Sequence, residues 1–200
     1  MQSTSTGEGN AVKVSWAQLY NDVGGCQKCR LWETRTHVVP GEGDPHARLM
    51  FIGEGPGQDE DQQGRPFVGP SGQLLTRMIQ AIGMERGEVY ICNVVKCRPP
   101  RNRNPEPDEA AACLNYLRAP VALVRPEVVA LLGQVACQYT LNEQIFITRD
   151  HGQWRERKGV WFMPTFHPSA LLRDPAKKRD AWEDFQKIRD KLNELRGGAQ

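Results

Sequence analysis

The stretch FIGEGPGQDEDQQGRPFVGPSG, residues 51–72, begins as an apolar run and changes at Gly53 into a glycine-rich loop. An apolar run that ends in such a loop is typical of a β-strand leading into a ligand-binding turn, and many of these turns bind phosphate. This loop, however, contains four carboxylates: Glu54, Asp59, Glu60 and Asp61. Because carboxylates repel phosphate, the stretch predicts a strand followed by a binding site whose ligand is still to be defined.

Three more apolar runs have the length and the β-rich composition of strands. Together with the first, they occupy residues 48–52, 89–95, 127–132 and 160–166. Helical periodicity surrounds these runs, with Ser71 as a candidate N-cap of the helix after the acidic loop. Helices are expected at residues 15–23 and 71–82, from residue 107, after Gly133 and over residues 182–195. This alternation predicts one domain, residues 15–196, with a three-layer α/β/α fold around a central four-stranded parallel sheet.

The composition excludes some classes of protein and leaves others open. Two hundred residues with 39% hydrophobic content are enough for one packed domain, and a net charge of +2 identifies no partner. No apolar run reaches the roughly 18 residues that a membrane span needs. Residues 1–14 are polar and rich in glycine, serine and threonine, which favours a disordered lead-in over a secretory signal. We therefore expect a cytoplasmic protein whose six cysteines are metal ligands or buried thiols, not disulfides.

Polar side chains follow the ends of the predicted strands. They are Glu54 after Gly53, then Asn93, Gln134 and His167. Because ligands of an open α/β sheet bind beyond the carboxyl ends of its strands, an acid, an amide and an imidazole are expected to meet in one crevice. Any one of them alone could instead be an ordinary polar residue at the start of a loop.

Four cysteines have the spacing of a metal site. Cys26 and Cys29 form a C-x-x-C motif, whereas Cys97 follows a predicted strand and Cys113 lies on the next helix. Four thiolates can bind zinc or a 4Fe–4S cluster, and their spacing alone does not distinguish the two. Either group would join distant segments of the chain, which favours a structural role. The remaining two cysteines are expected to be buried thiols in a strand and a helix: Cys92 and Cys137.

The segment KCRPPRNRNP, residues 96–105, places several cations beside Cys97. Its three prolines resist helix formation and are expected to hold the loop extended. Arg98, Arg101 and Arg103 would then be available to contact the phosphates of a nucleic acid. The alternative is an ordinary solvated basic loop.

The chain resembles the family-4 uracil-DNA glycosylases, the iron–sulfur branch of the uracil-DNA glycosylase superfamily. The resemblance covers residues 15–190 and includes the pattern of the four cysteines. It rests on GEGPGQDED (53–61), GRPFVGPSG (64–72), NVVKCRPPRNRNP (93–105) and FHPSALLR (166–173). It implies a structural 4Fe–4S cluster instead of zinc, a parallel sheet between helices, and hydrolytic release of uracil from DNA without a metal in the chemistry.

The resemblance assigns catalytic roles to Glu54 and His167. Uracil must leave the base stack before its glycosidic bond can be reached. Glu54 would stabilise the positive charge that develops on the sugar and orient the attacking water, and His167 would donate a hydrogen bond to uracil O2 as the base departs as an anion. Gly55, which has no side chain, would let backbone amides approach the base.

The resemblance also assigns residues that recognise the base and the DNA. Asn93 would pair with N3–H and O4 of uracil, a pattern that cytosine reverses. Phe67 would stack on the base unless it is an ordinary core residue, and Glu60 would exclude the methyl group of thymine. Leu171 would fill the gap left in the duplex, and Arg173 would contact the flanking phosphates.

The chain has no histidine-bearing insertion between Asn93 and Pro107, where related proteins carry one that captures the abasic sugar covalently. We therefore expect ordinary hydrolytic turnover by a monomer, on uracil in single- or double-stranded DNA. Two functions of other classes remain open. One is a non-catalytic DNA-binding protein with a redox-sensing cluster. The other is a zinc-stabilised nucleotide hydrolase that binds magnesium in the acidic loop.

Overall fold

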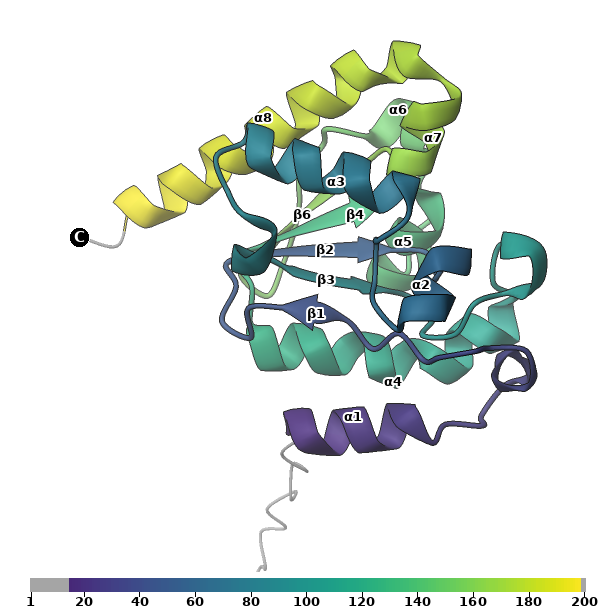
Figure 1. Cartoon of the computed structure of the whole chain (residues 1–200). Coiled ribbons are helices and arrows are strands. Elements are labelled where there is room, and N and C mark those ends of the chain that lie inside the picture. Colours follow the sequence, from purple (N-terminus) through teal and green to yellow (C-terminus); the bar gives the residue numbers. More distant parts are fainter. Residues whose placement is uncertain (1–14, 199–200) are drawn as a thin grey trace, which may run out of the picture.

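A computed structural model describes residues 15–198 and has one sheet at its centre (Figure 1). Four inner strands, in the order β3-β2-β4-β6, run parallel to one another. They are β2 (Leu49–Gly53), β3 (Tyr90–Asn93), β4 (Val128–Leu132) and β6 (Val160–Thr165). The predicted four-stranded parallel sheet is thus confirmed as the central part of the observed sheet.

The complete sheet has six strands, and its two edge strands were not predicted. β1 (Glu42–Gly43) pairs antiparallel with β3, and β5 (Arg155–Arg157) pairs antiparallel with β6. Neither edge strand contains a buried residue. They therefore lack the apolar pattern that reveals a strand in a sequence, and their pairing depends on the neighbouring strand.

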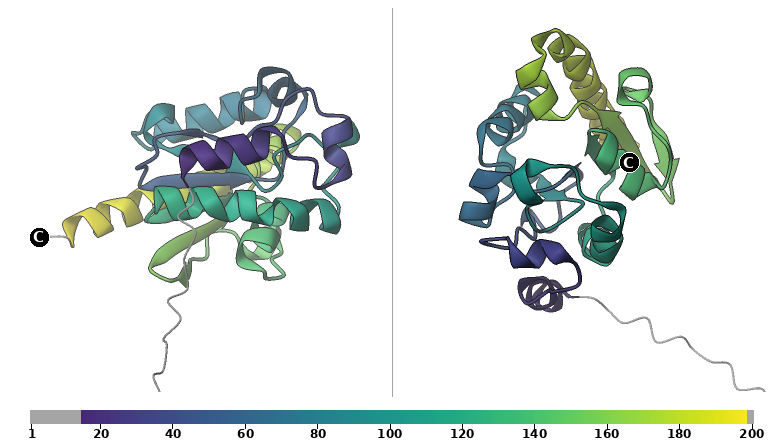
Figure 2. Two further views of the ribbon diagram at one scale, coloured as in Figure 1. Left: turned by 90° about the horizontal axis from the view of Figure 1, so that it is seen from below. Right: turned by 90° about the vertical axis from the view of Figure 1, so that its right-hand side faces the viewer.

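Helices cover both faces of the sheet, as Figures 1 and 2 show. Successive strand residues point to opposite faces, so that Ile52 packs with the helices α1, α4 and α5 while Phe51 packs with α3 and α8. The three-layer α/β/α prediction is therefore confirmed. The α-helices are α1 (Trp16–Gly24), α2 (Gln58–Gln63), α3 (Pro70–Ala81), α4 (Pro107–Val124), α5 (Gln134–Leu141), α6 (Ile147–Asp150), α7 (Pro168–Arg173) and α8 (Lys178–Gly197).

The starts of α1, α4 and α5 agree with the prediction to within one residue, whereas α8 begins four residues before the predicted 182, and α2, α6 and α7 were not predicted. Ser15 caps α1 by accepting a hydrogen bond from the backbone N–H of Gln18 at 3.2 Å. The expected N-cap of α3, Ser71, lies inside the helix instead, because Pro70 occupies the first helical position and Gly69 is the N-cap. The fixed φ of proline suits that position.

Residues 1–14, for which a disordered lead-in was expected, lie outside the described residues. Within residues 15–198, no helix is long and apolar enough to cross a membrane.

Candidate functional site

Three predicted site residues meet where the inner strands end, at the end of the sheet that faces the viewer in the right-hand panel of Figure 2. Gly53 and Asn93 are partners in the β2–β3 register, and a Cβ on Gly53 would lie 2.5 Å from Oδ1 of Asn93 and 2.5 Å from Cζ of Phe67. The ring of Phe67 lies 5.6 Å from the imidazole of His167, with the two planes 33° apart. The amide of Asn93 and the imidazole of His167 therefore both lie beside the ring of Phe67. We call Glu54, Phe67, Asn93 and His167 the strand-end cluster.

The side chain of Asn93 has an unsatisfied oxygen. The residue is only 1% exposed, and Oδ1 has no hydrogen-bond partner within the described chain. Buried polar atoms in native proteins almost always have a partner, and an orphaned one therefore calls for an explanation. A ligand that offers an N–H group next to Phe67 and His167 would provide one.

His167 is held in a defined tautomer at the N-terminus of α7. Its Nδ1 accepts a hydrogen bond from the backbone N–H of Ser169 at 3.1 Å, so that a neutral ring carries its proton on Nε2. Burial, together with the positive charge of Arg173, lowers the pKa of His167 to about 4. The imidazole is therefore a neutral hydrogen-bond donor at physiological pH.

Glu54 is the carboxylate of the acidic loop that directly follows the end of β2. Burial raises its pKa, and the positive charge of Arg173 opposes that rise. The positive charge of Arg173 lowers the pKa of both Glu54 and His167. The three side chains therefore interact electrostatically. The backbone beside Glu54 is fixed, since its carbonyl accepts from Val95 N at 3.2 Å.

Two other carboxylates of the acidic loop bind backbone amides of the protein itself. Glu60 accepts from Gly57 N at 3.0 Å, from Val68 N at 2.8 Å and from Gly69 N at 2.9 Å. Asp61, which is 3% exposed, accepts from Thr36 N at 2.9 Å. Two of the four carboxylates of this loop therefore hold the backbone in place. The exclusion of thymine by Glu60 stays a prediction, for a carboxylate that already has three partners.

Gly55 lies against the segment that follows β3. A Cβ on Gly55 would lie 2.8 Å from Cγ2 of Val95, and Pro99 is within 3.6 Å of the same point. The glycine is needed for this close packing between two loops. Its predicted approach to a base is not tested by these contacts.

The prediction that Leu171 enters DNA stays a prediction, for a side chain that the structure buries. Leu171 is 1% exposed and packs with Phe166 and Ala181, whereas the next residue, Leu172, is 42% exposed. The prediction counted four residues from His167, but α7 turns that position into the protein interior. Leu172 is the apolar side chain that α7 presents to solvent.

The basic segment after β3 is not extended as predicted. It forms a 3₁₀ turn over Pro100–Asn102, in which Arg101 has a φ of 56°. Arg103 binds the buried carboxylate of Glu109 with distances of 2.7 and 2.8 Å, and Arg98 donates to Asn102 at 2.7 Å. Of the three arginines, Arg103 is therefore committed to the protein, while Arg101 is exposed at the turn.

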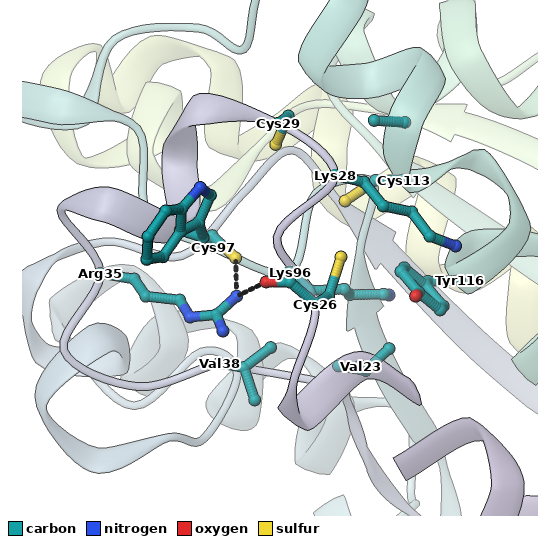
Figure 3. Close-up of a pocket in the computed structure, with 12 residues that line it drawn as sticks. Val23, Cys26, Lys28, Cys29, Arg35, Val38, Lys96, Cys97, Cys113 and Tyr116 are labelled. Carbon is teal, nitrogen blue, oxygen red and sulfur yellow. Dashed lines mark hydrogen bonds between the residues drawn. The ribbon is translucent and has the colours of Figure 1, made fainter. Parts of the chain in front are cut away.

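All four predicted metal-binding cysteines line one cavity, and Figure 3 shows their sulfur atoms around the same space. Arg35 donates to Sγ of Cys97 at 3.1 Å and to the carbonyl of Cys26 at 2.9 Å. Burial raises the pKa of Cys113 to about 11 and also raises that of Cys29 and Cys97. The other two cysteines, Cys92 and Cys137, are buried elsewhere, as predicted.

The arrangement of these thiols limits the kind of metal group that they could bind. Among the described residues, no three His, Cys, Asp or Glu side chains are close enough together to bind a single metal ion. Zinc would require sulfur atoms about 2.3 Å from one centre. The four thiols therefore share one cavity without the close grouping that a single ion needs.

Several residues at these sites could not be found from the sequence. Arg35 is 62 positions from Cys97, and the buried Lys96 donates to the carbonyl of Asn93 at 2.6 Å. Arg86 donates to the carbonyl of Phe67 at 3.0 Å from a distant turn. No local pattern marks these side chains, because their roles arise only when segments meet in the fold.

The chain matches the family model for the uracil DNA glycosylase superfamily over residues 40–186. It is 44% identical to a type-4 uracil-DNA glycosylase of Sulfurisphaera tokodaii, over 88% of this chain and 84% of that protein. It is 45% identical to a type-4 uracil-DNA glycosylase of Thermotoga maritima, over 82% of this chain and 88% of that protein. A type-5 uracil-DNA glycosylase of Thermus thermophilus is 34% identical over 52% of this chain and 53% of that protein.

Proposed function

Because the chain belongs to the uracil DNA glycosylase superfamily, we propose that it hydrolyses the N-glycosidic bond of deoxyuridine in DNA and releases uracil. The reaction leaves an abasic site and requires the nucleotide to rotate out of the base stack. The observation that carries this proposal is the orphaned amide oxygen of Asn93, which lies beside Phe67 and His167. Uracil offers an N–H group of the kind that this oxygen lacks.

Recognition of the base begins at Asn93. Its Oδ1 accepts from N3–H of uracil, and its amide N–H donates to O4. Cytosine carries an acceptor at N3 and a donor at C4, and would leave both groups of a fixed asparagine unpaired. A site that pairs polar groups in this way can reject the mismatched base by about 10⁴-fold. Phe67 stacks on the flat face of the base beside Asn93.

Departure of the base is assisted by His167. Uracil leaves as an anion, and negative charge develops on O2 as the bond breaks. The neutral imidazole donates its Nε2–H to that oxygen, since Nδ1 is engaged by Ser169. Such a preorganised donor contributes most in the transition state, where the charge is largest.

Glu54 acts on the sugar side of the breaking bond. As the base leaves, positive charge develops at the anomeric carbon, and the Glu54 carboxylate stabilises it and orients a water for attack. Arg173 stabilises the ionised form of this carboxylate within a site where burial alone would favour protonation. The same arginine is placed to contact a flanking phosphate.

Contacts with the rest of the DNA come from α7 and from the 3₁₀ turn. Leu172 replaces Leu171 as the side chain that wedges into the base stack, because it is the exposed one. Arg98 and Arg101 contact phosphates, whereas Arg103 supports the turn through Glu109.

The cavity thiols Cys26, Cys29, Cys97 and Cys113 would hold a 4Fe–4S cluster. The fit rests on the donor set and its surroundings: four thiols around one cavity, with Arg35 and Lys96 beside them. These cations suit four thiolates, which together carry excess negative charge. When bound, the cluster would join the segment after α1 to the β3–α4 connection and take no part in the release of uracil.

The test is a set of oligonucleotides that contain U, T, C, hypoxanthine or xanthine, each as single strand and duplex, incubated with purified protein in a chelator. We expect release of uracil and protein of brown colour. A redox-sensing DNA-binding protein would bind these oligonucleotides without releasing a base. A zinc-stabilised nucleotide hydrolase would be colourless and inhibited by the chelator, and either result would refute the proposal.

A further inference from the structure

Phe67 has a backbone conformation that aromatic residues rarely adopt. Its φ is 51°, in the left-handed region that favours glycine. Bulky residues persist there only when the surrounding structure holds them, and such residues concentrate at functional sites. Something in the fold must therefore hold the backbone that places this ring beside Gly53 and His167.

Packing from α3 supplies part of that restraint. A Cβ on Gly72 would lie 1.9 Å from the carbonyl carbon and 1.9 Å from the carbonyl oxygen of Phe67. The helix therefore presses directly against the left-handed residue, and only glycine leaves room for it. This contact limits where the backbone can lie but forms no hydrogen bond that would orient the carbonyl.

Arg86, at the start of the 3₁₀ helix η2 (Arg86–Glu88), orients two successive carbonyls. Its guanidinium donates to Phe67 O at 3.0 Å and to Pro66 O at 2.5 Å. The other donors of the same group bind Thr76 Oγ1 at 3.3 Å and Glu42 Oε1 at 2.8 Å. The side chain is 19% exposed, so that these bonds are largely shielded from solvent.

We propose that Arg86, held by Glu42 of the edge strand β1, is a positioning residue that fixes Phe67 in its left-handed conformation and thereby sets the stacking surface for the base. The planar fork of arginine suits this task, because it can bind two carbonyls and a carboxylate in one geometry. The inference rests on the proposed release of uracil, since it assigns the ring of Phe67 to the base.

Without Arg86, the chain can relax toward a more ordinary φ at residue 67. The ring would then leave its place against Gly53 and the base would lose its stacking surface. The side chain of Arg86 would not itself touch the substrate. Its effect on base release should therefore depend entirely on the presence of the Phe67 ring.

The chain offers a matched control in Arg65. This arginine donates to the same carboxylate, Glu42, at 2.8 and 3.2 Å, but to neither of the two loop carbonyls, and it is 59% exposed. We expect Arg86→Met to lower kcat/KM for uracil release by about tenfold, in line with the free energy of a left-handed residue. Arg65→Met should change it less than twofold. Equal effects of the two substitutions would overturn the proposal.

A double-mutant cycle separates positioning from general destabilisation. Arg86→Met should lower kcat/KM about tenfold in the wild-type background, and less than about twofold in a Phe67→Ala background. A loss of the same size in both backgrounds would refute a role through Phe67. If Arg86→Met does not fold, Arg86→Lys takes its place in the cycle, because lysine retains the charge opposite Glu42 but cannot bind both carbonyls at once. Wild-type protein that releases no uracil would instead refute the proposed function.

Discussion

In the proposed reaction, single residues of the strand-end cluster act either in recognition of the base or in its departure. Asn93 supplies an unpaired oxygen in a buried place, while His167 supplies a neutral N–H whose tautomer is fixed by Ser169. Both groups are preorganised before any ligand arrives. Preorganised donors and acceptors account for a large part of the rate enhancement of many enzymes.

Removal of either group should slow base release strongly. We expect Asn93→Ala and His167→Ala each to lower the single-turnover rate by about a hundredfold, or about 3 kcal/mol of transition-state stabilisation. Asn193→Ala is the control, because that asparagine lines a separate cavity with residues of α8. Wild-type rates in Asn93→Ala and His167→Ala would refute the assignment of the site.

The pH dependence of kcat/KM should report Glu54. Burial raises the pKa of this carboxyl above its ordinary value, and the group is active only when ionised, so that activity should fall as the pH drops through that raised pKa. His167, with a pKa of about 4, becomes protonated only at a lower pH than Glu54. In Glu54→Gln, we expect a low kcat/KM that no longer falls as the pH drops through this range. An unchanged acid limb in this variant would assign the titration to another group.

The location of single residues is predictable from the sequence where a motif fixes both the type and the position, while their roles stay predictions. Asn93 and His167 were placed by strand ends and by motif, and the structure brings both beside Phe67. Leu171 is buried because the position four residues after His167 faces the interior, and on a helix the next side chain points about 100° away. Arg86 was missed because its partners lie about 20 positions away in an irregular segment.

At the scale of elements, the helix α7 presents one leucine to the core and the next to solvent. Leu171 packs with Phe166, which immediately precedes His167, and Leu172 is exposed. The two neighbours therefore permit a direct comparison between a structural and a DNA-contacting role.

Truncation of each leucine should have a different effect. Leu172→Ala should slow uracil release from duplex DNA more than from a single strand, since only the duplex has a stack to wedge apart. Leu171→Ala should lower the free energy of unfolding by about 2–5 kcal/mol, as expected for a buried leucine. Urea unfolding and release rates on both substrates measure these effects. A duplex-specific defect in Leu171→Ala alone would reverse the assignment.

A strand could be predicted from the sequence when its own residues formed an apolar run. The four inner strands are continuous apolar runs, because both faces of a parallel sheet are buried. The edge strands β1 and β5 have no such run, and the 3₁₀ turn over Pro100–Asn102 depends on contacts with Glu109. The sequence therefore predicts the layers of the fold, whereas tertiary contacts determine the edge strands and the 3₁₀ turn.

At the scale of the whole molecule, the cysteine cavity and the strand-end cluster are joined by one short segment. Residues 93–97 carry Asn93 at one end and Cys97 at the other, and Lys96 donates back to the carbonyl of Asn93 at 2.6 Å. Val94 and Val95 donate to the carbonyls of Gly53 and Glu54. The segment that carries Cys97 is therefore hydrogen-bonded to the backbone of the strand-end cluster.

Loss of one cavity cysteine should therefore destabilise the whole domain. We expect Cys29→Ala to lose iron and to lower the melting temperature by about 10 °C, because binding free energy of a structural metal site is folding free energy. Cys137→Ala is the control, since that cysteine is buried outside the cavity, and it should keep its iron. Equal iron content in the two variants would refute the cluster assignment.

The most direct test of the central claim is a crystal structure of the protein bound to DNA that carries 2′-fluoro-2′-deoxyuridine, which resists cleavage. The account predicts an extruded uracil stacked on Phe67, with N3 within hydrogen-bond distance of Oδ1 of Asn93 and O2 facing Nε2 of His167. A uracil bound elsewhere, or retained in the duplex with the Asn93 oxygen still unpaired, would contradict it.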